Sequence, residues 1–459
     1  MAETETRADQ GTTLDRVAAF ALNLAIEDIP SDVLARMAVL MLDTLGVGAA
    51  AVGMEAGRIA RETALALYGA GPGGWSAPML FDGRIASTAG AAFALASQID
   101  NLDAHDGYNP TKGHTGVAIF PALLALAGRH PAMSGPAALA AATVGYEIAG
   151  RAATALHATV GDYHTSGAWN ALGVAAMAAR IEGMGPATLR EALGIAEFHG
   201  PRSQMMREIA TPTMLHDGSG MGALIGISAA VMAGLGFTGA PAVTVEAPEV
   251  AGDWADLGRH WQVPLYYIKP YPVCRWAHAA IDGTRAIRLA HRLDPDRIAA
   301  IEVESFAYAA DLFAGLPETS SKAQYGLPFA VAVMAVHGEI GVGHITGAGL
   351  TDARVIEMLK RVSVTASARF TDRYPAERRA EVTIRTTDGA VLRSGDIHAR
   401  GGPEAPMAEA EILEKYHRYA DPVLGETRAR AIHDAVLGLT APGARLADLL
   451  PLLTEGVAA

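Results

Sequence analysis

The hydrophobic pattern of this chain changes its period near Pro264 and changes back after Pro406. From about residue 13 to Pro264, apolar residues recur at helical spacing; Leu34, Met37 and Met41, for example, stand at i, i+3 and i+7. Beyond Pro264, apolar and polar residues alternate in short runs, as they do in strands with one buried face. The two patterns predict a helical part and a second part that contains strands.

The helical part holds two segments that are rich in alanine and glycine and nearly free of charge, residues 170–182 and 221–235. Helices that are apolar on almost every side belong at the centre of a large domain. Small side chains also let neighbouring helices approach closely. We therefore expect these segments to be packed core helices.

The strand-containing part alternates at residues 298–304, at 362–366 and from Val382 to Val391, where Asp388-Gly389 marks a hairpin turn. Helical stretches near 278–292 and 323–337 separate these runs. Strands interspersed with helices on this scale are typical of a small α+β domain.

The segment GGPEAP at 401–406 resembles a linker, and helical patterning returns from about 407 to 455. The predicted fold is therefore mainly α with an α+β part. A large helical domain is formed by residues 1–266 and 404–459, and residues 267–403 form an α+β lid. A crevice between two such domains is a usual place for a ligand.

Composition excludes several classes of function. The formal net charge is −13 and no basic tract is present, which argues against nucleic acid and anionic membranes as partners. Cys274 is the only cysteine, too few for a disulfide within the chain or for an iron–sulfur cluster. The first ten residues, MAETETRADQ, are too polar for a signal or transit peptide. The charge-free stretch 221–237 is better explained as a buried helix than as a membrane span, so we expect a cytoplasmic protein.

Polar residues that can carry chemistry gather in four segments beside apolar helical runs: 100–114, 157–164, 202–217 and 266–278. Histidine titrates near neutral pH and suits proton transfer, whereas arginine and lysine suit carboxylate binding. A solvated loop or a structural ion pair explains any one of these residues equally well. Four such segments, each beside an apolar helix, favour a shared site.

Other chemistries find less support in the sequence. The histidine spacing matches no zinc-protease motif, so we expect no metal. The glycine-rich stretches 69–74 and 341–347 lack the strand–loop–helix context of a dinucleotide site, and no GxSxG motif is present. We expect no organic cofactor.

Together these segments resemble the MmgE/PrpD family along nearly the whole chain. The resemblance rests on DTLGVGAAAVG, LDAHDGYNPTKGHTG, YHTSGAWNALG, MLHDGSGMGA, KPYPVCRWAH and AQYGLPFAVAV. It implies a helical domain with an α+β lid, an active site between them and a homodimer. It also implies a small polycarboxylic acid as substrate and no iron–sulfur cluster.

The resemblance also suggests roles for individual residues. Asp103 and His114 match the first aspartate and the closing histidine of the family's acidic loop, and His164 matches the histidine before the central helix. These three are the candidate catalytic residues. Lys269 and His278 match basic residues of the lid segment. The full set expected to bind substrate is Lys112, Arg207, His216, Lys269, Arg275 and His278.

Three positions depart from the pattern of the decarboxylase-like members. Gly107 stands where those members have threonine, Thr213 or His216 where they have lysine, and Phe329 where they have tyrosine. These changes argue against the particular activities of the decarboxylase and of the 2-methylcitrate dehydratase, and favour a relative with another substrate.

Three functions are consistent with the sequence. The first is a cofactor-independent lyase, most simply a dehydratase, that removes a proton α to a carboxylate. The second is an epimerase or isomerase, which needs the same proton abstraction and for which His114 and His164 would be a pair of bases. The third is a protein that binds a carboxylate without catalysis.

Overall fold

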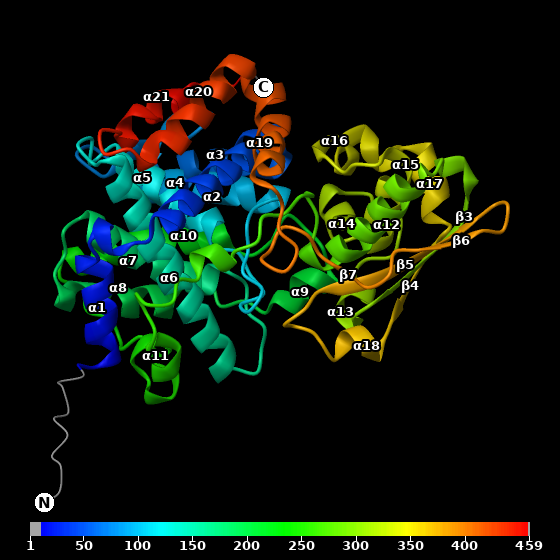
Figure 1. The fold of residues 1–459 in the computed structure, drawn as a ribbon. Helices are drawn as coiled ribbons and strands as arrows, with labels where there is room; N and C mark the ends of the chain where they lie inside the picture. The colour runs from blue at the N-terminus through cyan, green and yellow to red at the C-terminus, as the bar shows by residue number, and fades with distance from the viewer. Residues whose placement is uncertain (1–10, 458–459) are drawn as a thin grey trace, which may run out of the picture.

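The computed structural model describes residues 11–457 and has two halves, which lie side by side in Figure 1. One half is helical, and the other is built around a small sheet. The predicted fold class, mainly α with an α+β part, is confirmed. The expectation that the chain starts without a targeting peptide concerns residues 1–10, which lie outside the described residues.

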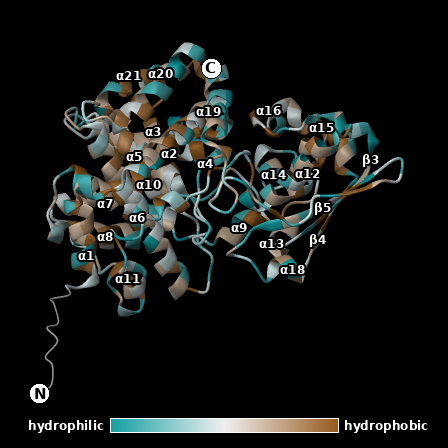
Figure 2. Ribbon diagram, in the orientation of Figure 1, coloured by the Kyte–Doolittle hydropathy of each residue, from teal (hydrophilic) through white to brown (hydrophobic). Residues whose placement is uncertain are grey.

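The helical half has α7 and α10 at its centre, where they pack on each other, and α6 packs on α7. Its helices are α1 Thr13–Asn23, α2 Ser31–Ala50, α3 Glu55–Leu67, α4 Thr88–Leu102, α5 Gly116–Ala127, α6 Gly135–Thr159, α7 Gly167–Ile181, α8 Pro186–His199, α9 Met205–Ala210, α10 Ser219–Gly234 and α11 Val243–Glu246. The apolar segments singled out from the sequence are thus α7 and α10. Figure 2 shows how hydrophobic residues concentrate on these central helices.

Within residues 11–457, α2 is the one helix long and apolar enough to cross a membrane. Of its most apolar stretch, 78% is buried inside the protein. The α6 and C-terminal helices pack against it.

The α+β half carries a five-stranded sheet with the strand order β4-β3-β5-β6, and β7 pairs with β5. Its strands are β3 Ile298–Ser305, β4 Val362–Ala366, β5 Arg379–Thr386, β6 Val391–Arg393 and β7 Ile397–His398. The β3–β4 pair is parallel and the other pairs are antiparallel. Helices α12 (His278–His291) and α15 (Leu327–His337) pack on β5 and β4 and cover the sheet (Figure 1).

Two local features differ from the sequence expectation. The helix expected over 323–337 is interrupted at Gly326, which separates α14 (Ser320–Gln324) from α15. A short hairpin of β1 (Ser76–Pro78) and β2 (Ile85–Ser87) interrupts the region expected to be helical throughout. Three-residue strands are too short to show an alternating pattern, so periodicity does not reveal them.

The C-terminal helices return to the helical half. Helices α19 (Glu409–Leu424) and α20 (Glu426–Leu437) pack on α2, as the orange and blue ribbons of Figure 1 show, and α21 (Leu450–Thr454) follows. The buried ammonium of Lys415 on α19 lies 2.7 Å from the Asp43 carboxylate on α2. The exact domain boundaries at 266/267 and 403/404 stay a prediction.

Close packing of α7 and α10 depends on glycine. A Cβ atom on Gly226 of α10 would lie 2.5 Å from Val174 Cβ and 2.7 Å from the Ala171 carbonyl oxygen, both on α7. Neither atom can swing aside, because one is a branched Cβ and the other is helix backbone. On Gly234, also in α10, a Cβ would meet only the flexible end of Met184, at 3.3 Å.

We expect Gly226→Ala to destabilise the protein and Gly234→Ala to leave its stability unchanged or raise it. Alanine gains about 1 kcal/mol over glycine in a helix, but overpacking a core costs about 1–3 kcal/mol. In denaturant melts, Gly226→Ala should therefore have a lower free energy of unfolding than Gly234→Ala, by about 1–3 kcal/mol. Equal stability of the two variants would show that α7 and α10 are not held this closely.

Candidate active site

The loop between α4 and α5 supplies the main polar groups of the site. Asp103 ends α4 in the left-handed conformation, with φ 56°, and so turns the chain out of the helix. Farther along, the Gly107 N–H donates to the Tyr267 carbonyl oxygen (3.0 Å), and the Tyr267 N–H donates back to Gly107 (2.8 Å). These bonds attach the loop to the segment that leads into α12 of the α+β half.

His114 closes the loop in a fixed orientation. Its Nδ1 donates to the Asp106 carbonyl oxygen at 2.6 Å. Because a carbonyl can only accept, the ring proton of neutral His114 is on Nδ1 and the lone pair is on Nε2. Burial, followed by the nearby Lys269 ammonium, lowers the pKa of His114 below its ordinary 6.5. At neutral pH the ring is therefore a free base at Nε2.

Asp217 lies opposite this lone pair. Its Oδ2 is 3.6 Å from His114 Nε2, and its Oδ1 accepts from the Ser166 N–H (3.1 Å) and hydroxyl (2.5 Å). The Asp217 carboxylate thus occupies the N-terminus of α7, where a negative charge is favoured. Ser166, the residue before α7, makes no side-chain cap and instead accepts from the His114 N–H (2.9 Å).

A buried ion pair joins the two halves at this site. The Lys269 ammonium pairs with the Asp103 carboxylate and also donates to the Asp103 carbonyl oxygen at 3.0 Å. Burial is the largest single effect and lowers the pKa of Lys269, but the charge and hydrogen bond of Asp103, together with the nearby Tyr267 and Cys274, outweigh it and the net pKa is raised. Lys269 therefore remains a cation. The second carboxylate oxygen of Asp103 is buried without a hydrogen-bond partner among residues 11–457.

Two further carboxyl groups lie beside this pair. Burial, and then the Asp217 charge, raise the pKa of Asp100 and of Glu208 well above the ordinary range. Both groups therefore hold a proton more tightly than ordinary carboxyl groups do. The Tyr325 hydroxyl donates to Glu208, and Asp100 accepts from the Ser219 N–H at the start of α10 (3.0 Å).

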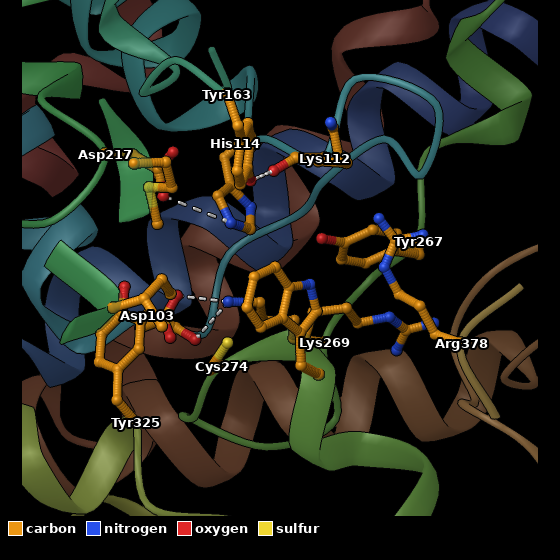
Figure 3. Close-up of a pocket in the computed structure, with 14 residues that line it drawn as sticks. Asp103, Lys112, His114, Tyr163, Asp217, Tyr267, Lys269, Cys274, Tyr325 and Arg378 are labelled. Atoms are coloured by element: carbon orange, nitrogen blue, oxygen red, sulfur yellow. Dashed lines mark hydrogen bonds and ion pairs between the residues drawn. The ribbon is translucent and has the colours of Figure 1, made fainter. Parts of the chain in front are cut away.

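Asp103, His114, Asp217 and Lys269 line one narrow cavity with about 20 Å³ of free space, room for about one water molecule. Figure 3 shows Asp103 and Asp217 on one side of it and Lys112 and Arg378 on the other. The charged residues of the lining are two carboxylates and four cations: Asp103, Asp217, Lys112, Lys269, Arg275 and Arg378. An acid larger than water can enter only if the two halves separate.

Comparison with known proteins agrees with this architecture. Residues 15–263 match the MmgE/PrpD N-terminal domain, and residues 271–440 match the MmgE/PrpD C-terminal domain. The chain belongs to the MmgE/PrpD family. It is 25% identical to a cis-aconitate decarboxylase of Aspergillus terreus, over 98% of this chain and 96% of the relative. It is 23% identical to a cis-aconitate decarboxylase-like protein of Aspergillus oryzae, over 97% of this chain and 98% of the relative.

The MmgE/PrpD fold brings many of the predicted site residues together. The lining includes five of them, listed as Asp103, Lys112, His114, Lys269 and Arg275. His216 is buried next to the cavity with its ring 5.6 Å from that of Tyr325. The charges of Asp103 and Asp217 act on the pKa of His216, which burial nevertheless lowers.

Besides His216, three predicted residues are not among those that line the cavity. The backbone of His164 forms an isolated antiparallel bridge with that of Gln204, and His164 is not part of the cavity lining. His278 is buried at the start of α12, where its Nε2 bonds to the Val273 carbonyl oxygen (3.1 Å) and holds the preceding turn. Arg207 is exposed on α9. Their roles stay predictions.

Two of the positions that depart from the decarboxylase-like pattern, Gly107 and Phe329, have surroundings that the structure describes. A Cβ atom on Gly107 would collide with the Tyr267 hydroxyl and lie 2.8 Å from His114 Nδ1. Tyr267 therefore fills the space that a larger residue at position 107 would need. Phe329 is buried in α15 and, like Gly107, does not line the cavity.

Several lining residues were not predicted. Tyr163, Asp217 and Cys274 stand within the polar segments, each next to a predicted residue. That position in the sequence was the one signal that could have found them. Tyr267 stands two residues before the KPYPVCRWAH motif, and Tyr325 lies within AQYGLPFAVAV. Arg378 precedes β5 in a highly charged stretch, and nothing in the pattern marks it. Burial raises the pKa of Cys274 to about 12, so its thiol is neutral.

One group of side chains has the spacing of metal ligands. Asp103, His105 and His114 each offer a ligand atom, and these atoms lie within 4.8 Å of one another. Both His105 ring nitrogens are buried without a hydrogen-bond partner within residues 11–457. The Lys269 ammonium, however, already pairs with Asp103, so a cation is in place where an ion bound to this carboxylate would lie.

We therefore expect metal removal to leave the protein unchanged. After exhaustive dialysis against EDTA, metal analysis should find far less than one ion per chain, and the melting temperature should not change. Added Zn²⁺ should not raise the melting temperature, since a ligand that binds only the folded state stabilises it. One tightly bound ion per chain that is needed for turnover would contradict this expectation.

Proposed function

We propose that the protein is a lyase that acts on a small di- or tricarboxylic acid by removing a proton α to a carboxylate, without a metal or organic cofactor. The observation that carries the proposal is the state of His114. This residue lines the cavity near the Lys269 ammonium, its ring is neutral, and its lone pair is on Nε2. The relatives named cis-aconitate decarboxylase, whose name denotes a lyase, support this class of chemistry.

The first step in this mechanism is proton transfer to His114. An α-proton is weakly acidic, so the developing aci-carboxylate needs positive charge in a dry site. Lys269 supplies that charge, and its pairing with Asp103 fixes its position. The imidazolium that forms on His114 is stabilised by Asp217, 3.6 Å from Nε2.

The second step is protonation of the leaving group, which completes a dehydration. Burial raises the pKa of Tyr267 and, well above its usual range, that of Tyr325, so both keep their protons at neutral pH. Both line the cavity and are candidate acids beside His114. A decarboxylation would instead break the bond to CO₂ without prior loss of the α-proton; the electron pair stays on carbon, and that carbon takes a proton from an acid of the cavity such as Tyr267.

The alternative is an epimerase, which takes a proton from one face of the carbon and returns one to the other. A pair of histidines for that purpose finds no support in the cavity lining, because His164 is not part of it. The lyase is therefore the preferred proposal. Binding without catalysis explains the cations but not a base whose tautomer is fixed.

We also propose that the protein is a cytoplasmic homodimer and that residues 267–403 act as a lid on the helical domain. Large apolar side chains exposed on the helical half, Phe198, Leu215 and Leu235, support a subunit contact there. The closed cavity between the halves supports the movement of the lid.

A deuterium experiment tests the chemistry. The protein is incubated in D₂O with a panel of di- and tricarboxylic acids, with and without a hydroxyl group, and followed by proton NMR. We expect loss of the α-proton together with a new olefinic or decarboxylated product. Exchange with inversion and no product would replace the lyase by an epimerase, and the absence of exchange with every acid would leave only binding.

Replacement of His114 tests the assignment of the base. His114→Gln should lose roughly 100-fold or more in kcat, the lower end for general acid–base catalysis. A base works above its pKa and is lost as the pH falls through it. Because the pKa of His114 is lowered, the acidic limb of the kcat/KM profile should lie below pH 6.5 in the unmodified protein.

His164→Gln is the matched control and should stay within a few fold of normal kcat, because His164 does not line the cavity. Melting temperatures of both variants check that the fold is intact. If His114→Gln keeps its kcat while His164→Gln loses it, the base is His164.

A further inference from the structure

The buried cations of this protein fall into two classes. Residues 11–457 hold five buried lysines and arginines, listed as Arg151, Lys269, Arg275, Arg378 and Lys415. Three of them have a carboxylate partner within 4.0 Å: Arg151 with Asp256 and Glu147, Lys269 with Asp103, and Lys415 with Asp43. Arg275 and Arg378 have none among the described residues, and both line the cavity.

The guanidinium of Arg378 is only 2% exposed and bonds to neutral groups alone. Its Nη1 donates to the Pro375 carbonyl oxygen (3.0 Å) and its Nη2 to that of Asn109 (3.1 Å). Its Nε is buried with no acceptor in the described chain. Arginine stays charged inside proteins, so Arg378 is a buried positive charge that no described carboxylate neutralises.

Arg275 repeats this arrangement at 4% exposure. It donates to the carbonyl oxygens of Ala399 (3.0 Å) and Arg400 (2.5 Å), and its Nε is also buried without a partner among residues 11–457. Its guanidinium carbon lies 4.2 Å from the centre of the Tyr267 ring, which holds it flat against the cavity wall.

The positive charges at this end of the cavity repel one another. Burial, with a smaller contribution from the Arg378 charge, lowers the pKa of Arg275 to about 10. Burial and Arg378 likewise lower the pKa of Lys112 at the rim of the cavity. The nearest carboxylates with an effect on Arg275 are Asp282, which pairs with Arg400 at 2.9 Å, and the exposed Glu404.

An unpaired buried charge is costly, and the cost is removed when a ligand brings the opposite charge. We propose that Arg275 and Arg378 form a subsite for a second carboxylate of the substrate, remote from the carbon that loses its proton. This inference rests on the proposed function and deepens it by assigning the carboxylates of the substrate to separate places, one near Lys269 and one between the two guanidiniums. A monocarboxylate leaves the subsite empty and binds weakly.

The subsite also explains why the residues come from both halves. Arg275 and Arg378 belong to the α+β half, whereas Asp103 and His114 belong to the helical half. Through the Asn109 carbonyl, Arg378 also holds the catalytic loop. An acid held by these cations of the α+β half presents its reacting carbon to His114 of the helical half, and so bridges the halves and favours their closed arrangement.

Calorimetric titration of the full chain with two probes tests the proposal. Tricarballylate carries three carboxylates and no hydroxyl group that could be eliminated, and butyrate carries one carboxylate. We expect Arg378→Gln and Arg275→Gln each to weaken tricarballylate binding roughly 10- to 100-fold, the effect of losing a charged hydrogen bond. The weak binding of butyrate should not change.

Two further variants separate charge from structure. Arg379→Gln removes the same charge one residue away, but Arg379 pairs with Asp396 at the surface (2.8 Å), so tricarballylate binding should be unchanged. Arg378→Lys keeps the charge without the fork and should bind tricarballylate more tightly than Arg378→Gln. Melting temperatures identify a variant that fails to fold. If Arg378→Gln does not fold, the binding of tricarballylate by Arg275→Gln and Arg378→Lys decides whether the subsite exists.

Normal tricarballylate binding by folded Arg275→Gln and Arg378→Gln would overturn the subsite while leaving the lyase proposal intact. Equal weakening of tricarballylate and butyrate would also overturn it, because it would mark a general structural role. Failure of the proposed function has a different signature: tricarballylate binds through the arginines, yet no acid exchanges deuterium.

Discussion

The buried pair of Asp103 and Lys269 is the interaction on which the site depends. Burying two charges costs several kcal/mol per ion, so such a pair persists only with good geometry and additional hydrogen bonds. Here the ammonium reaches both the carboxylate and the carbonyl oxygen of the same residue. Because Asp103 ends α4 and Lys269 begins the α+β half, one interaction fixes the two halves relative to each other and closes the cavity between them.

The same pair sets the chemistry of its neighbours. Lys269 remains charged and helps to lower the pKa of His114, which keeps that ring neutral and basic. Asp217, held at the N-terminus of α7 by Ser166, has the opposite effect on the His114 pKa and stabilises the protonated ring once it forms. A base flanked by one cation and one anion can accept a proton and release it again without leaving an isolated charge in a dry site.

Periodicity predicts the fold class because the core helices are long and nearly free of charge, whereas the three-residue strands β1 and β2 leave no periodic signal. The loop around His114 was predictable because polar residues there interrupt apolar runs. Arg378 was not, because its sequence neighbour Arg379 is of the same type in the same charged stretch. Only the folded structure separates them: Arg379 pairs with Asp396 at the surface, and Arg378 is turned into the cavity.

This contrast between paired and unpaired cations suggests how binding and closure are linked. Lys269 and Lys415 have their compensating carboxylates within the protein itself. Arg275 and Arg378 instead oppose the closed state, because their charges are buried together without compensation. A substrate carboxylate reverses that penalty, and it does so only when the reacting carbon is already beside His114. In the proposed mechanism, the free energy that closes the two halves comes from the group that identifies the substrate, so a molecule without that group would leave His114 open to water.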